Sequence, residues 1–128
     1  MAMNATECPF CCLPEENVLA RTDMAVAFYD RFPVSPGHVL VIPEDHVGSL
    51  LELPEKDLTE LWSLVAYIRN QLKAQYQPAG FNIGINEGVA AGQTVAHAHI
   101  HIIPRYAGDV PDPRGGIRWV LPDKAKYW

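Results

Sequence analysis

The feature that most constrains the fold is the run 95–103, in which His97, His99 and His101 alternate with apolar residues. This period of two is typical of a β-strand that buries one face. The three imidazoles then share the other face at intervals of about 7 Å, twice the rise per residue of a strand. Such spacing predicts a row along one extended, anionic substrate, because imidazole at neutral pH can act as nucleophile, acid, base or donor. The alternative is a histidine-rich strand with a structural or adventitious metal-binding role.

Composition limits the classes of protein that remain. The 128 residues predict a single domain, and 48% hydrophobic with 20% charged residues is ordinary for a soluble globular protein. A net charge of −5 argues against a nucleic acid polymer as partner, because such binding needs a basic face. No apolar run is long enough to span a membrane, and the N-terminus lacks the pattern of a secretion signal. Three cysteines bunched at 8–12 do not make a disulfide framework, so we expect a cytoplasmic protein.

Periodicity predicts an α+β fold. Apolar residues recur every three or four positions from Pro54 to Tyr76, which predicts one long amphipathic helix. A glycine-rich loop at 87–92 precedes the histidine run. We expect an antiparallel sheet of about five strands that is covered on one face by the helix. The other predicted strands are 18–21, 24–29, 38–42 and 81–86.

The histidine run matches the His-φ-His-φ-His-φ-φ signature of the histidine triad (HIT) superfamily, where φ is hydrophobic. Further blocks resemble the family in order and spacing: 28–30, 36–43 with His46 after it, 86–88 and 92–95. The resemblance covers the core, about 8–105, and leaves a C-terminal tail, 106–128. It implies a HIT-like fold with one long helix and a shorter one, two associated protomers, and cleavage at the α-phosphate of a purine nucleotide.

Within the superfamily the chain resembles two branches. Gly92-Gln93-Thr94 and the segment 104–109 favour dinucleoside polyphosphate hydrolases of the fragile histidine triad type. Asn86-Glu87-Gly88 favours the adenosine phosphoramidases called histidine triad nucleotide-binding proteins. We therefore expect a hydrolase that acts on diadenosine tri- or tetraphosphate-like substrates, with the phosphoramidase as the alternative.

The resemblance also implies roles for single residues. His99 takes the place of the nucleophile that forms a covalent nucleotidyl-histidine, while His101, His97 and His38 complete the catalytic group. Implied substrate contacts come from a ribose-binding Asp30, from Phe28 and Leu13 at the base, and from polar groups at Asn86, Gln93 and Thr94. The alternatives are that Asp30 only caps a turn and that Gln93 and Thr94 only stabilise the loop.

Cys8-Pro-Phe-Cys11 has the spacing with which two sulfurs grip one zinc ion, but a lone pair is half a site. The resemblance implies that His46 and His97 complete a structural zinc site, with no cofactor required for catalysis. The alternative is a pair of metal-free thiols, and Cys12 has no predicted role.

Two other classes of function remain open. His-x-His also serves catalytic zinc, so a metal-dependent hydrolase is one. A nucleotide-binding module without turnover is the other, although binding alone does not need a nucleophile. The tail raises a further question, because Arg114 or Arg118 would suit distal phosphates but is as well explained by packing at the interface of a homodimer.

Overall fold

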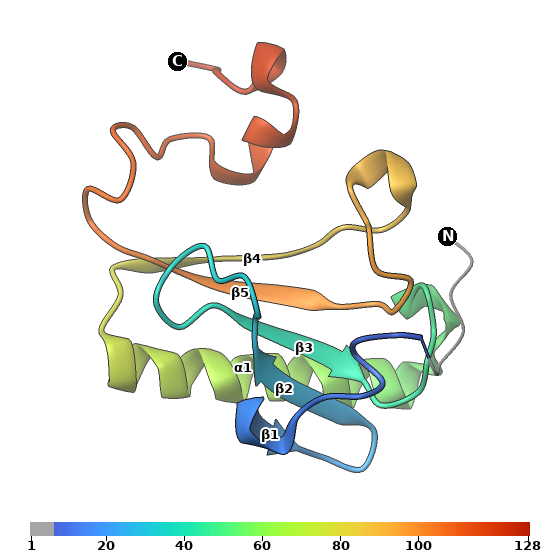
Figure 1. The fold of residues 1–128 in the computed structure, drawn as a ribbon. Coiled ribbons are helices and arrows are strands. Elements are labelled where there is room, and N and C mark those ends of the chain that lie inside the picture. Colours follow the sequence, from blue (N-terminus) through green and yellow to red (C-terminus); the bar gives the residue numbers. More distant parts are fainter. Residues whose placement is uncertain (1–6) are drawn as a thin grey trace.

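A computed structural model describes residues 7–128. The N-terminal residues, for which no secretion signal was predicted, lie almost wholly outside this range. Five strands form the predicted antiparallel sheet, and their order is β1-β2-β3-β5-β4 (Figure 1). Strand β4 therefore lies at one edge of the sheet. The bounds are β1 Val18–Arg21, β2 Ala25–Tyr29, β3 Val39–Pro43, β4 Gly80–Ile85 and β5 Ile100–Arg105.

Helix α1, Glu55–Tyr76, follows the predicted range. Pro54 precedes its first turn, Glu55 and Asp57 lie at its positive N-terminal end, and Gln77 ends it in a left-handed conformation. The buried stripe of α1 packs against one face of β2, β3 and β5 and forms the main core. That stripe contains Leu61, Leu64, Val65, Ile68 and Leu72.

The opposite face of the sheet, which we call the open face, carries the chemistry. Alternation along β2 and β3 places Val26, Phe28, Leu40 and Ile42 there as a second apolar cluster. His101 on β5 lies opposite Leu40 in the pairing of β3 with β5, so its side chain belongs to this face.

Two details of the predicted fold are corrected. The histidine run does not form a strand from residue 95, because residues 95–97 bend and β5 starts only at Ile100. The second, shorter helix appears in the described part of the chain only as short 3-10 helices. Two of these, Gly116–Val120 and Pro122–Lys124, fold the tail, which lies beyond β4 and apart from α1 (Figure 1). None of the helices in residues 7–128 has the length and apolar character needed to cross a bilayer.

Candidate functional site

His99 is the candidate nucleophile, and one hydrogen bond selects the tautomer of its neutral ring. The residue is 8% exposed, and its Nδ1 lies 2.8 Å from the backbone carbonyl oxygen of His97. A carbonyl only accepts, so Nδ1 carries the proton and donates it to that oxygen. The lone pair is therefore on Nε2, which is the state that a nucleophilic imidazole needs. The bend before β5 makes this contact possible, because it brings a carbonyl two residues back within reach of the ring.

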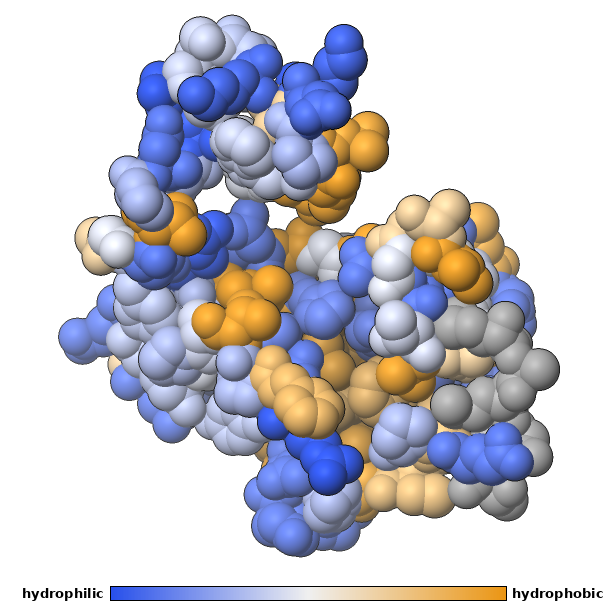
Figure 2. All heavy atoms as spheres, turned by 45° about the horizontal axis from the view of Figure 1, so that its top comes forward, coloured by the Kyte–Doolittle hydropathy of each residue, from blue (hydrophilic) through white to orange (hydrophobic). Residues whose placement is uncertain are grey.

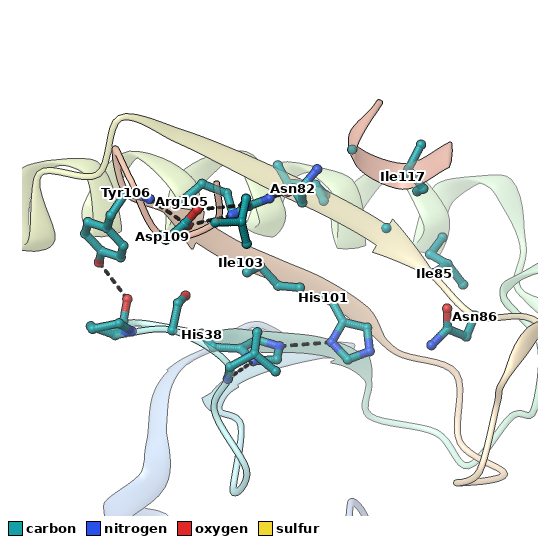
Figure 3. A pocket seen from close by; sticks show the side chains of 17 residues that line it. His38, Asn82, Ile85, Asn86, His101, Ile103, Arg105, Tyr106, Asp109 and Ile117 are labelled. Carbon is teal, nitrogen blue, oxygen red and sulfur yellow. Dashed lines mark hydrogen bonds and ion pairs between the residues drawn. The ribbon is translucent and has the colours of Figure 1, made fainter. Parts of the chain in front are cut away.

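His38 and His101 form a proton-ordered pair beside this nucleophile. The backbone N–H of Val34 donates to His38 Nδ1 at 3.1 Å, which leaves the proton of neutral His38 on Nε2. That Nε2 lies 3.0 Å from His101 Nδ1 (Figure 3). His101 Nδ1 consequently accepts, and the Nε2–H of neutral His101 remains as a donor. The ring centres of His99 and His101 are 5.2 Å apart, so this donor lies next to the nucleophile.

The surroundings keep these imidazoles uncharged. Burial, followed by the neighbouring His99 and His38, lowers the pKa of His101 from 6.5 to about 4. Burial also lowers the pKa of His38, although the nearby Asp30 carboxylate opposes this shift. At neutral pH both rings are therefore neutral, as the hydrogen-bond order between them requires.

His97 departs from the predicted row of three imidazoles. Its Nε2 donates to the backbone oxygen of Pro43 at 2.8 Å, and its Nδ1 faces the thiols of Cys8 and Cys11 at 3.5 Å. The reason is the bend at 95–97, which turns this ring away from the line of β5. His97 contacts His99 through its backbone carbonyl, which accepts from His99 Nδ1. The predicted row of imidazoles is therefore reduced to His99 and His101.

Cys8, Cys11, His46 and His97, the set that the family resemblance implied for a metal site, come together in the structure. Their ligand atoms all lie within 4.8 Å of one another. Tetrahedral zinc, with Zn–S of about 2.3 Å and Zn–N of about 2.0 Å, separates sulfur and nitrogen ligands by about 3.5 Å. The two cysteine–His97 distances equal this value, and Cys11 Sγ lies 3.2 Å from His46 Nδ1. The bond from His97 to Pro43 also leaves Nδ1 as the free ligand atom.

Asp30 lies at the end of β2 beside this pair. Its Oδ1 accepts the N–H of Phe32 at 2.8 Å, so it caps a turn, and its Oδ2 lies 3.4 Å from His38 Nε2. Asp30, His38 and His101 also have the donor atoms of a metal site. However, metal on His38 Nε2 would require an imidazolate, because Nδ1 already accepts from Val34. We therefore interpret the trio as a hydrogen-bonded relay, which disfavours a metal-dependent hydrolase at this point.

The loop residues divide into two groups. Gln93 is buried, and its amide is used within the loop: it accepts from the N–H of Gly88 and donates to the carbonyls of Gly48 and Val95. These bonds match the alternative prediction for Gln93, in which its side chain only stabilises the loop. Thr94 is exposed next to it, and Asn86 lies after β4 near His101 (Figure 3).

Phe10 is a site residue that sequence reasoning did not single out. Its ring lies 5.2 Å from the ring of His99, 6.0 Å from that of His97 and 5.3 Å from that of Phe28. Phe28 itself is buried in the open-face cluster, with Leu13 packed against that cluster. The sequence signal that could have found Phe10 is its position between Cys8 and Cys11. Two metal ligands on either side would fix Phe10 relative to the third ligand, His97.

A pocket of about 640 Å³ opens on the far side of His101 from His99. It follows the open face past Ile103 to Arg105, and Ile117 of the tail closes it from above (Figure 3). In the space-filling view the tail stands over this hollow on the surface (Figure 2). Neither Arg114 nor Arg118 is among the residues that line it.

A family model described as HIT domain matches residues 14–108, a range that contains all the histidines of the site. The chain belongs to the HIT family. A solved HIT family protein from Bacillus anthracis has 37% sequence identity and a TM-score of 0.76, with 83% of this chain and 78% of that one covered. This HIT protein thus has the predicted architecture as well as the predicted motif.

Two relatives of this HIT protein carry names that describe an activity. A bis(5'-nucleosyl)-tetraphosphatase (asymmetrical) from Schizosaccharomyces pombe is 44% identical over 92 residues, which cover 72% of this chain and 50% of that protein. An AP-4-A phosphorylase from Mycobacterium tuberculosis is 35% identical over 105 residues, which cover 81% and 54%. The match spans about half the length of both relatives.

Proposed function

We propose that this HIT protein is a hydrolase that cleaves dinucleoside polyphosphates at an α-phosphate through a covalent nucleotidyl-His99. The observation that carries the proposal is the hydrogen bond from His99 Nδ1 to the carbonyl of His97, which places the lone pair of the neutral ring on Nε2. The names of the two relatives support the substrate class. The alternative is an adenosine phosphoramidase, which uses the same nucleophile on a smaller leaving group.

The proposed reaction proceeds in two steps. In the first, His99 Nε2 forms a bond to the α-phosphorus while the bond from phosphorus to the bridging oxygen breaks, and the leaving phosphate takes the electron pair. The Nε2–H of His101 stabilises the charge that develops on the phosphoryl oxygens. In the second step a water oxygen bonds to phosphorus, the P–N bond breaks, and His99 returns to its neutral state as the water proton is released.

The test is to trap the adduct. Wild-type protein mixed with diadenosine tetraphosphate and quenched in base within milliseconds is expected to gain the mass of one adenylyl group, mapped to His99 by peptide mass spectrometry. His99→Ala is expected to lose the adduct and to lower kcat by at least about a thousandfold, with nucleotide affinity within about tenfold.

His101→Gln is the matched variant, because it weakens a donor and keeps the nucleophile. It is expected to form the same adduct more slowly. Absence of an adduct in wild type combined with an active His99→Ala variant would refute the proposal. A panel with adenosine 5'-phosphoramidate distinguishes the two substrate classes by kcat/KM.

We also propose that Cys8, Cys11, His46 and His97 bind a structural zinc ion. Zinc would tie the N-terminal segment to the bend at 95–97, which precedes the proposed nucleophile. The thiol of Cys11 needs this charge, because burial and the neighbouring Cys8 raise the pKa of Cys11 to about 11. A bound cation favours the thiolate form that Cys11 otherwise resists.

Metal analysis is expected to find one zinc per chain in wild type. Cys8→Ser with Cys11→Ser is expected to lose the metal and at least about 2 kcal/mol of unfolding free energy, measured with urea. Cys12→Ser is the control, since Cys12 is exposed and outside the ligand group. Metal-free wild-type protein with the stability of the double variant would contradict the proposal.

We propose, third, that the protein is a homodimer paired along the outer edge of β4. This strand ends the sheet, so one side of its backbone has no partner strand in the described residues. Ile83 and Ile85 on β4 are each more than a third exposed. An open apolar edge is a surface that proteins normally cover, and a second copy supplies a strand of the same length.

A further inference from the structure

The pocket beyond His101 continues the reaction site in one direction. Position 99 holds the nucleophile, position 101 the donor, and the same face of the chain then presents Ile103 and Arg105 to the pocket. Asp30 lies on the other side of His38, in a separate hollow that shares Val34–Pro36 and His38 with this pocket. A phosphate held between His99 and His101 therefore has one exit toward Asp30 and another into the larger pocket.

The charges in the pocket cancel. Arg105 donates from Nε and from one terminal nitrogen to the two carboxylate oxygens of Asp109, at 2.7 and 2.8 Å. Its other terminal nitrogen donates to Asn82 Oδ1 at 2.6 Å. The charge of this guanidinium is therefore already neutralised by Asp109, so the pocket offers no unpaired cation to a polyphosphate tail.

Most of the rest of the lining is apolar. Its apolar side chains include Ile103, Val110 and Ile117, and its polar groups include Ser35, Tyr106 and the amides of Asn82 and Asn86. Apolar walls with a few polar groups and a volume between about 300 and 1,000 Å³ are typical of sites for neutral organic groups. The pocket of about 640 Å³ lies inside that range.

The tail contributes to the pocket through Ile117 rather than through its arginines. Arg114 pairs with Asp112 and lies over the ring of Trp128, and Arg118 donates to the carbonyls of Ala125 and Lys124. These bonds fold the tail on itself. Between them, Ile117 reaches Gly84 of β4 so closely that a Cβ at position 84 would lie 3.3 Å from Ile117 Cδ1.

We propose that this pocket binds the nucleoside of the leaving nucleotide, and that Ile117 determines selectivity for substrates with a second nucleoside. The inference rests on the proposed nucleotidyl transfer to His99 and adds the group that leaves. A neutral, flat base and its ribose suit apolar walls without a free charge, whereas pyrophosphate does not. Ile117 is 64% exposed, so it has apolar surface left for a base to cover.

The experiment compares two substrates that share the adenylyl part. Diadenosine tetraphosphate carries a second nucleoside, and adenosine 5'-phosphoramidate releases only ammonia. Ile117→Ala is expected to lower kcat/KM for diadenosine tetraphosphate about fivefold, mainly through KM, and to leave the phosphoramidate value within about twofold. Val110→Ala, at the same pocket, is expected to shift the ratio in the same direction.

Val120→Ala and Leu121→Ala are the matched controls, because both are exposed apolar tail residues outside the pocket lining. They are expected to leave both substrates unchanged. An equal loss on both substrates with Ile117→Ala, no loss on the dinucleotide, or the same loss with the controls would overturn the inference. If wild type turns over neither substrate, the proposed function itself fails, which is a different outcome.

Discussion

Hydrogen bonds decide which ring nitrogen carries the proton in four of the five histidines of this protein. Two backbone carbonyls and one backbone N–H each fix a ring nitrogen, and the fourth ring takes its order from the third. This order fits the proposed roles: a nucleophile at His99, a donor at His101, a relay at His38 and a metal ligand at His97.

At this residue scale the structure predicts a pH dependence of stability. The pKa of His101 is about 4 in the folded protein, below its ordinary value near 6.5, because burial disfavours the charged ring. A lowered folded-state pKa means that the unfolded chain binds the proton first. The contribution of His101 to stability is therefore complete above pH 6.5 and is lost as the pH falls toward 4, by at most about 3 kcal/mol.

Urea unfolding of wild type and His101→Gln at pH 7.5, 5.5 and 4.5 measures this contribution. The variant cannot titrate at this position, so its free energy of unfolding is expected to fall less steeply with acidification. Parallel curves for the two proteins would show that His101 is not the group responsible.

At the scale of elements, a glycine sets the entry into β3. Gly37 has a φ of +87°, and a Cβ there would lie 3.0 Å from the ring of Tyr76 at the end of α1. The left-handed backbone and the close helix both require glycine. This contact fixes the backbone at Gly37, which lies directly before His38 and two residues before the start of β3.

Gly37→Ala is accordingly expected to lower the free energy of unfolding by about 1–3 kcal/mol, because both strain and a clash result. Gly80→Ala is the control, since nothing lies within 4 Å of a Cβ there and its backbone is not left-handed. That variant is expected to stay within about 0.5 kcal/mol of wild type. Thermal or urea unfolding of both variants checks the difference, and equal losses would contradict the explanation.

At the scale of the whole molecule, the unpaired edge of β4 predicts a dimer in solution. Light scattering is expected to give twice the mass of one chain, and Ile83→Lys is expected to give single chains at micromolar concentration, because a charge on the edge opposes strand pairing. Tyr67→Lys on the exposed side of α1 is the control. A chain shortened after Gly108 is expected to remain paired, and a single-chain mass for wild type would refute the dimer.

The sequence by itself determined everything that depends on local periodicity. The three- and four-residue spacing of apolar residues placed α1 correctly, and alternation placed four strands within a residue at each end. The spacing of the histidines placed them on one face of a predicted strand, and the resemblance to the HIT superfamily named His99 and the four metal-ligand candidates. The elements could be predicted because side-chain direction in a helix or strand repeats along the chain.

Only the tertiary structure decided what depends on contacts between distant segments. The bend at 95–97 removed His97 from the row, and its ring found Cys8, almost ninety residues earlier in the chain. A backbone N–H, that of Val34, decides which ring nitrogen of His38 carries the proton. Every residue type except proline offers such a group, so the identity of residue 34 could not predict this contact. Of the tail residues considered, Ile117 rather than Arg114 or Arg118 reached the pocket, because the arginines bond within the tail itself. Such contacts leave no periodic trace, since they are fixed by how the sheet, the N-terminal segment and the tail pack together.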